Sequence, residues 1–175
     1  MQAVFMSKTL IYADHAATTA LSPTAREAME PFLGTFYGNP STLYSLARDP
    51  RKAIAQSREV IAAAIHANPS EIFFTSGGTE ADNWAIFSTC ERLKKRGNHI
   101  VTTAVEHHAV LHPMKALESK GFEVTYLQPD EAGFVCADAL KAALRPDTIL
   151  VSVMMVNNES GAVMPIADMI RITRR

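Results

Sequence analysis

The chain has 175 residues and a mass of 19.1 kDa, a size that suits one ordinary domain or part of a larger protein. Hydrophobic residues make up 47% of the chain and charged residues 20%, a composition that excludes a disordered, collagen-like or coiled-coil protein. The formal net charge of -1 leaves no global positive field, which disfavours nucleic acid as a partner.

The sequence contains no signal for export, membrane insertion or disulfide formation. The N-terminus has no basic start followed by a continuous apolar run, so we expect a cytoplasmic protein. The most apolar stretch, residues 149–156, is far shorter than the ~20 residues that a membrane helix needs. Cys90 and Cys136 form neither a disulfide framework nor a zinc motif, and we expect both thiols to be buried or partly buried.

The first 70 residues contain two predicted helices. A Ser-Pro pair at 22–23 has the N-cap pattern of a short helix that ends near Gly34. After the GNPS turn at 38–41, isoleucines at helical spacing predict an amphipathic helix over 51–66. No repeat or linker marks a domain boundary inside the chain.

Strand and helix patterns alternate from residue 71 onwards. The predicted strands are 71–74, 99–103, 122–127 and 148–156, and the predicted helices are 79–96, 108–120, 137–144 and one that Pro165 opens. Repeated βα units with apolar strands predict an α/β fold, with a mostly parallel sheet flanked by helices. The last helix has no Gly or Asn cap, so we expect a truncated chain; a short C-terminal helix that frays is the alternative.

Polar residues follow three of these four strands, at 75–80 (TSGGTE), 106–108 (EHH) and 157–161 (NNESG). Because ligands bind beyond the carboxyl ends of parallel strands, we expect the three loops to converge on one rim. The two glycines of the first loop let the backbone approach an anion, the helix that follows offers free N–H groups, and Thr79 adds a hydroxyl. The loop matches no nucleotide-binding motif, and a plain strand-to-helix turn capped by Thr79 is an equal alternative.

The histidines and asparagines of the other two loops also have two interpretations. His107 could stack on a planar ligand or transfer a proton, or could be a solvated loop residue. Asn157 and Asn158 could orient a ligand through their amides, or form an Asx turn. His108 and His112 have helical spacing, but the HExxH pattern is missing, so we expect no metal site.

Together these residues resemble the cysteine desulfurases of the class V aminotransferase family, which are pyridoxal-phosphate enzymes of fold type I. The stretches that carry the resemblance are YADHAATT (12–19), GNPS (38–41), FTSGGTEADNWAI (74–86), VEHHAV (105–110), GFEVTYL (121–127) and VNNESG (156–161). They are most similar to the branch that serves iron-sulfur clusters and nitrogen fixation, and selenocysteine lyases share them. The resemblance implies an N-terminal segment, residues 1–20, followed by an incomplete pyridoxal-phosphate-binding large domain, residues 21–175.

The resemblance also implies residue roles around the cofactor. Gly78 and Thr79 would hold the phosphate of pyridoxal 5'-phosphate, and His107 would stack on the pyridine ring and assist proton transfer. Asn158 would bind the ring hydroxyl. The residues implied to lie near the substrate are Asn158, Asn39 and Thr18.

The implied reaction removes sulfur from L-cysteine, leaving L-alanine, and passes the sulfur through an enzyme persulfide to an acceptor or iron-sulfur scaffold protein. The resemblance also implies a homodimer for the full-length protein, while the charge and the hydropathy pattern indicate no nucleic-acid and no membrane partner. The family's cofactor Lys, pyridine-nitrogen Asp, persulfide Cys and carboxylate-binding Arg have no match in this sequence, so we expect the chain alone to be inactive. The alternatives are a non-catalytic assembly module that pairs with a complementing chain, and a related class V aminotransferase or selenocysteine lyase.

Overall fold

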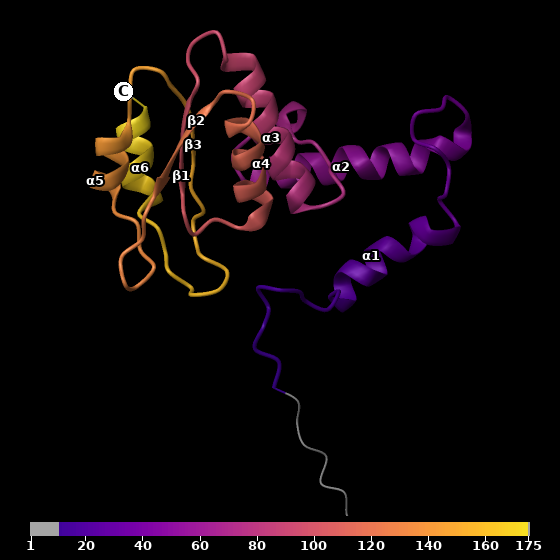
Figure 1. The fold of residues 1–175 in the computed structure, drawn as a ribbon. Helices are drawn as coiled ribbons and strands as arrows, with labels where there is room; N and C mark the ends of the chain where they lie inside the picture. The colour runs from indigo at the N-terminus through magenta and orange to yellow at the C-terminus, as the bar shows by residue number, and fades with distance from the viewer. Residues whose placement is uncertain (1–10, 175) are drawn as a thin grey trace, which may run out of the picture. The chain divides into compact units, whose positions relative to one another are not determined.

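The structure is a computed structural model that describes residues 11–174, grouped into two compact units. Unit 1 runs to Phe74 and unit 2 starts at Thr75, and each is described by itself (Figure 1). The expected division between residues 1–20 and 21–175 stays a prediction.

Unit 1 contains the two expected helices. They are α1 (Pro23–Gly34) and α2 (Arg48–Ala64), with 3-10 turns at Ser45–Ala47 and Pro69–Glu71. The Ser22 hydroxyl accepts a hydrogen bond from the Ala25 amide at 3.1 Å, so the predicted N-cap of the first helix is confirmed. Helix α2 begins three residues before its predicted start, because Pro50 is tolerated in the first turn of a helix.

The strand predicted at residues 71–74 is wrong. The segment has no strand partner among the described residues, and a side chain of α2 holds it instead. Arg58 donates from Nε to the Ile72 carbonyl at 3.0 Å, and its guanidinium lies 5.0 Å from the centre of the Phe74 ring. An apolar run needs a neighbouring strand to form a ladder, and α2 offers a cation and an apolar surface in its place.

Unit 2 is the α/β part of the chain, and the fold class predicted from the sequence is confirmed. Its elements are α3 (Gly78–Leu93), β1 (His99–Thr103), α4 (His108–Glu118), β2 (Glu123–Leu127), α5 (Ala137–Ala143), β3 (Thr148–Ser152) and α6 (Ile166–Thr173). Strand β3 ends four residues before its predicted end, because the chain turns back and Val156 pairs antiparallel with Val163.

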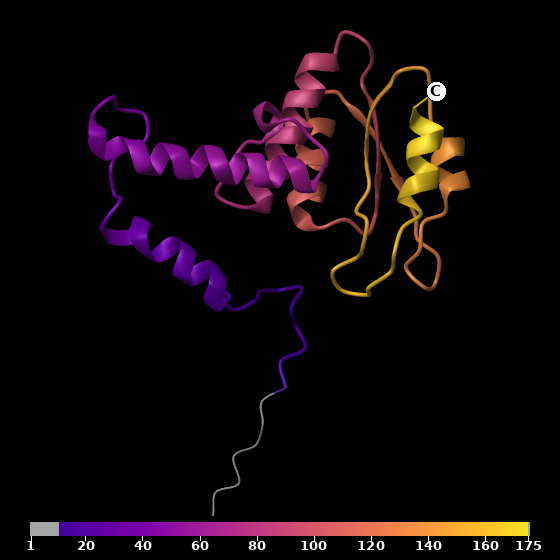
Figure 2. The same ribbon diagram turned by 180° about the vertical axis from the view of Figure 1, so that it is seen from behind.

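The three strands form a parallel sheet in the order β2-β1-β3. Helices α3 and α4 cover one face and α5 and α6 the other (Figures 1 and 2). Successive residues of the central strand serve the two faces, since Ile100 packs with Met114 of α4 and Val101 packs with Leu140 of α5. The central strand, which is buried along its whole length, therefore contributes one residue to each of the two cores.

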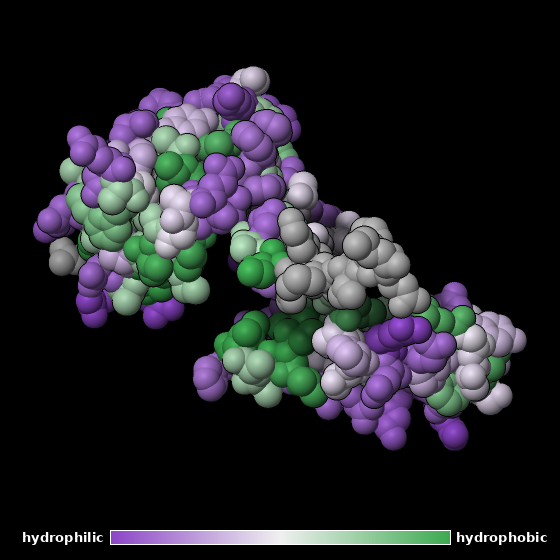
Figure 3. Space-filling model, turned by 90° about the horizontal axis from the view of Figure 1, so that it is seen from below, coloured by the Kyte–Doolittle hydropathy of each residue, from purple (hydrophilic) through white to green (hydrophobic). Residues whose placement is uncertain are grey.

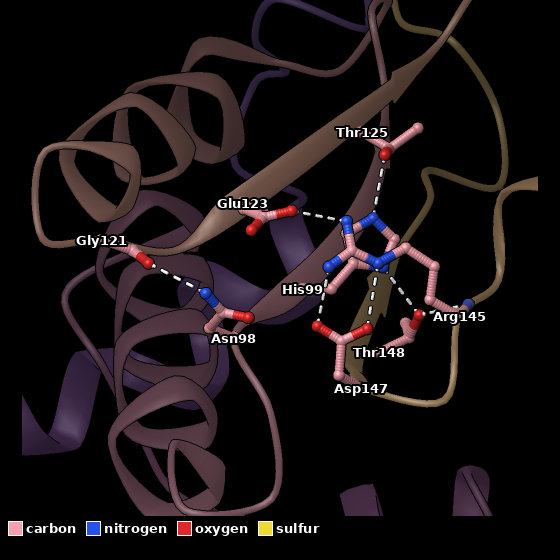
Figure 4. Close-up of polar contacts among 8 residues, drawn as sticks. All are labelled: Asn98, His99, Gly121, Glu123, Thr125, Arg145, Asp147 and Thr148. Atoms are coloured by element: carbon pink, nitrogen blue, oxygen red, sulfur yellow. Dashed lines mark hydrogen bonds and ion pairs between the residues drawn. The ribbon is translucent and has the colours of Figure 1, made fainter.

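The amino-terminal edge of the sheet carries a buried polar network (Figure 4). His99, the first residue of β1, is fully buried, and its ring meets the Thr148 hydroxyl of β3 at 2.7 Å and the Thr125 hydroxyl of β2 at 2.9 Å. Outside it, Arg145 pairs with Glu123 at 2.5 Å and with Asp147 at 2.8 Å. One histidine thus joins all three strands at the edge opposite to the predicted ligand rim.

The two cysteines differ in burial. Cys90 is buried in the core under α3, as expected, and burial raises the pKa of its thiol. Cys136 is exposed, which contradicts the expectation that both thiols are at least partly buried. It is the N-cap residue of α5, and the first position of a short helix leaves its side chain at the surface.

Large apolar side chains are exposed on each unit (Figure 3). They include Phe32, Leu33 and Ile65 in unit 1 and Trp84, Met155 and Val163 in unit 2. Exposed apolar side chains are typical of surfaces that contact other protein where they form contiguous patches. Within residues 11–174, every helix is too short or too polar to cross a membrane.

Candidate functional site

The N-termini of α3 and α4 lie side by side at the carboxyl edge of the sheet. The Asn83 side chain joins them, because its Nδ2 donates to the Thr79 carbonyl at 2.8 Å and to the Ala109 carbonyl at 3.1 Å. Thr79 belongs to the first turn of α3 and Ala109 to the first turn of α4. The loop at 75–78 and His107, the N-cap of α4, therefore open onto the same region.

The loop after β1 is joined to the loop after β3. Asn157 donates from Nδ2 to the Val105 carbonyl at 2.9 Å, and the Met154 amide donates to Oε1 of Glu106 at 2.7 Å. These bonds span 52 and 48 residues of sequence, so tertiary structure holds them. The structure thus brings together the three loops that the sequence placed on one rim.

The glycine loop leaves open space in front of α3. A Cβ atom added at Gly77 or Gly78 would meet no other atom within 4 Å, so packing inside the chain does not require these glycines. The Thr79 hydroxyl is exposed and has no hydrogen-bond partner among residues 11–174. The Glu80 carboxylate is turned back to Ser76, whose hydroxyl and amide bind it at 2.6 and 2.7 Å and lower its pKa. The loop can therefore accept an external anion at the N-terminus of a 16-residue helix.

His107 is held in one orientation by its own helix. Its Nδ1 accepts the Ala109 amide at 3.0 Å, which caps α4. Because Nδ1 accepts, the hydrogen of the neutral ring lies on Nε2, and the exposed ring presents that N–H outward.

The next two histidines form a pair. His108 and His112 stack at 5.2 Å between ring centres on the outside of α4. In the part of the chain that the structure describes, no three metal-ligating side chains are grouped. The structure therefore gives a planar, polar group at His107 and no assembled metal centre beside it.

The two asparagines left open by the sequence have separate roles. Asn157 is fully engaged, because its Oδ1 accepts the amides of Glu159 at 3.0 Å and Ser160 at 2.8 Å while its Nδ2 binds Val105. This is the Asx turn that the sequence offered as the alternative. Asn158 is exposed, and its side chain has no partner within residues 11–174. The turn leaves Asn158 available to a ligand.

Glu106 belongs to the loop at 106–108 that the sequence placed on the rim, but no role was predicted for its side chain. Its side chain is only 8% exposed, and Oε1 accepts from the Thr103 hydroxyl at 2.9 Å as well as from Met154. Burial raises the pKa of its carboxyl group, the two hydrogen bonds lower it in part, and the nearby Asp82 charge raises it further. Its position after a buried strand placed it at the ligand edge, but the residue type alone gave no sign of the contact with Met154.

The remaining predicted residues, Asn39 and Thr18, belong to unit 1. Asn39 caps its own turn, since its Oδ1 accepts the Ser41 amide at 2.9 Å. The Thr18 carbonyl accepts the Tyr12 hydroxyl at 2.9 Å. Both residues are exposed, and their proximity to a substrate stays a prediction.

Comparison with known proteins decides the family. The profile of the family described as aminotransferase class-V matches residues 11–175. The chain belongs to the aminotransferase class-V family. The resemblance inferred from the sequence motifs is thereby confirmed.

The class V relatives of this chain include proteins named as cysteine desulfurases. It is 51% identical to the cysteine desulfurase IscS of Clostridium botulinum over 158 residues, which are 90% of this chain and 40% of that protein. It is 45% identical to the cysteine desulfurase IscS of Methanosarcina thermophila over 164 residues, or 94% of this chain and 41% of that protein. The chain therefore spans about two fifths of the length of these relatives.

Solved structures of the family share the fold. A NifS-like protein superposes with a TM-score of 0.89 at 39% identity, over 92% of this chain and 44% of its own. A structure described as SspA in complex with cysteine gives a TM-score of 0.86 at 41% identity, over 92% of this chain and 46% of its own. The shared fold extends over nearly all of the present sequence.

Proposed function

We propose that this chain is the N-terminal part of a pyridoxal-phosphate-dependent cysteine desulfurase. The observation that carries the proposal is the joining of three loops at one edge of the sheet, because these loops and the helix starts beside them contain Gly78, Thr79, His107 and Asn158. The names of the class V relatives supply the reaction, and the cysteine bound in one of the solved structures supports the substrate.

The residues of the rim fit a flat, phosphorylated ring. Gly78 and Thr79 are exposed in the first turn of α3, where helix amides have no partner inside the helix, the environment that a phosphate prefers. His107 offers a planar ring of fixed tautomer, and Asn158 offers an amide. When bound, pyridoxal phosphate supplies an electron sink, while the protein supplies binding and orientation.

Each rim residue then has a proposed task. Gly78 and Thr79 hold the phosphate, and His107 stacks on the ring and holds or moves a proton at Nε2. Asn158 orients the ring hydroxyl and the substrate, and Asn39 and Thr18 lie near the substrate.

The overall reaction balances without an added oxidant. The C–S bond of L-cysteine breaks, the carbon gains a proton to give L-alanine, and the sulfur joins a thiol as a persulfide. The cofactor Lys and the persulfide Cys have no counterpart among the motifs of these 175 residues, so we propose that a further segment of the protein supplies them. We further propose that the full-length enzyme is a cytoplasmic homodimer that serves iron-sulfur cluster assembly or thio-cofactor synthesis.

The test is the product balance of the protein expressed from its complete gene. Supplied with pyridoxal phosphate, a thiol reductant and L-cysteine, it should release L-alanine and sulfide in equal amounts. His107→Ala should lower both rates together. Rapid turnover of L-selenocysteine with little turnover of L-cysteine would favour the lyase alternative. Absence of both products would favour the non-catalytic alternative.

A further inference from the structure

Glu106 is a buried acid without a cation. None of the salt bridges among residues 11–174 includes it, and the nearby charge identified is another acid, Asp82. Burying a carboxylate without a cation disfavours its ionised form, and a fold that needed only stability is better served by an apolar or amide side chain. The position of its hydrogen bonds suggests what this residue provides instead.

One oxygen of Glu106 fastens two loops. Oε1 accepts from Thr103, the last residue of β1, and from the Met154 amide, which lies beyond the end of β3. The carboxylate therefore closes the turn that follows β1 and attaches it to the loop that follows β3.

The residues joined in this way adjoin the two groups proposed to face the cofactor ring. His107 is the next residue after Glu106. On the other loop, Asn157 binds Val105, and Asn158 is the next residue after Asn157. Each ring-facing group is thus one residue away from a bond between the two loops.

We propose that Glu106 is a positioning residue that fixes the spacing between His107 and Asn158 for the cofactor ring. The proposal rests on the proposed function, because it assigns the fixed spacing to pyridoxal phosphate. Glu106 does not itself touch the reacting atoms and acts through the two loops.

Three variants and one control test the role. Glu106→Ala removes both hydrogen bonds, Thr103→Val removes one, and Glu106→Gln keeps an oxygen that can accept both while removing the charge. The matched control is Thr102→Val, because the buried Thr102 hydroxyl also joins β1 to β3, at 2.9 Å to the Ser152 carbonyl, without touching either loop.

The first readout is hydrogen exchange in the cofactor-free protein expressed from its complete gene, on peptides covering 104–110 and 153–161. Since a hydrogen bond to a charged group contributes enough to change an equilibrium by about tenfold or more, Glu106→Ala should speed exchange about tenfold in both loops. Exchange in β1 and β3 should be unchanged. Thr103→Val should have a smaller effect, and Glu106→Gln and Thr102→Val should leave loop exchange as in the wild type.

The second readout is the dissociation constant for pyridoxal phosphate, measured by absorbance. Glu106→Ala should raise it on the order of 10- to 100-fold, and Glu106→Gln should restore nearly wild-type binding. Equal effects of Glu106→Ala and Thr102→Val would reduce Glu106 to a structural role and overturn the proposal. So would faster loop exchange without a change in the dissociation constant. A wild-type protein that does not bind pyridoxal phosphate would refute the proposed function itself, whereas normal binding in both wild type and Glu106→Ala would refute the positioning role alone.

Discussion

Replacing His99 by leucine tests the polar network at the amino-terminal edge of the sheet. The Thr148 hydroxyl accepts the Arg145 amide at 2.8 Å and also meets Nδ1 of the His99 ring. Nε2 of the ring meets the Thr125 hydroxyl, so in the neutral ring one nitrogen donates to a threonine hydroxyl and the other accepts from one. His99→Leu keeps an apolar volume at the site but leaves the Thr148 and Thr125 hydroxyls without their ring partner.

The magnitude follows from the two lost bonds. Each neutral hydrogen bond contributes about 1 kcal/mol, and a buried group left unpaired costs about 1–3 kcal/mol. Because His99 is fully buried and both threonines are half-buried, we expect a loss of about 2–4 kcal/mol in the free energy of unfolding. In a chain of this size such a loss lowers Tm by roughly 5–15 °C.

The same variant has a pH signature. Burial lowers the pKa of His99 from 6.5, the Arg145 charge lowers it further, and Asp147 and Glu123 raise it in part. The unfolded chain therefore binds more protons than the folded one between the folded pKa and 6.5, so wild-type stability falls as pH drops through that window. His99→Leu should lose this part of the pH dependence.

The assay is urea unfolding of wild type, His99→Leu and His112→Leu at several pH values between 5 and 8. His112 is an exposed histidine of α4, so its replacement should stay within about 0.5 kcal/mol of wild type. A His99→Leu protein as stable as the His112→Leu control, or one that keeps the wild-type pH slope, would refute the network as described.

Three further substitutions test the rim. Gly78→Ala should leave Tm unchanged, because the added Cβ meets no atom within 4 Å. It should nevertheless weaken pyridoxal phosphate binding about tenfold. A titration that gives equal affinity for variant and wild type would argue against a phosphate at this loop. His107→Ala should lower the free energy of unfolding by about 1 kcal/mol, because α4 loses its N-cap, and should also weaken cofactor binding. If urea unfolding shows the stability loss but cofactor affinity is unchanged, His107 is only a capping residue. Asn83→Ala should speed hydrogen exchange in the first turns of α3 and α4, and unchanged protection there would show that their N-termini are held together without it.

The sequence predicted an element correctly where the local residue pattern matches the contacts that the element makes in the fold. The strand at 99–103 was predicted with its observed bounds, because it contains the β-formers Ile100, Val101, Thr102 and Thr103 and is buried along its whole length between two partner strands. The segment at 71–74 has an equally apolar pattern, but a strand also needs a partner, and local pattern does not report one. Arg58, which holds that segment, lies 14 residues before Ile72, and nothing in the local sequence indicates that the two are in contact.

The site shows the same limit. The Asn-Asn pair at 157–158 predicted a polar turn. Only the fold shows that Asn157 forms the turn and leaves Asn158 exposed. The role of Glu106 in joining two loops was not predicted, because its partner Met154 is 48 residues away and contributes a backbone amide, which no residue type reveals. The roles of Gly78, Thr79, His107 and Asn158 toward a cofactor came from family resemblance, and they stay predictions that the geometry makes testable.

The central claim is that these residues form part of a pyridoxal-phosphate enzyme. The most direct measurement is the intact mass of the protein from its native source after treatment with pyridoxal phosphate and borohydride, which links a bound cofactor covalently to its lysine. The account predicts a mass well above 19.1 kDa that carries one cofactor adduct per chain. A species of 19.1 kDa without an adduct would contradict it, and catalysis would then have to be assigned to a partner chain or abandoned.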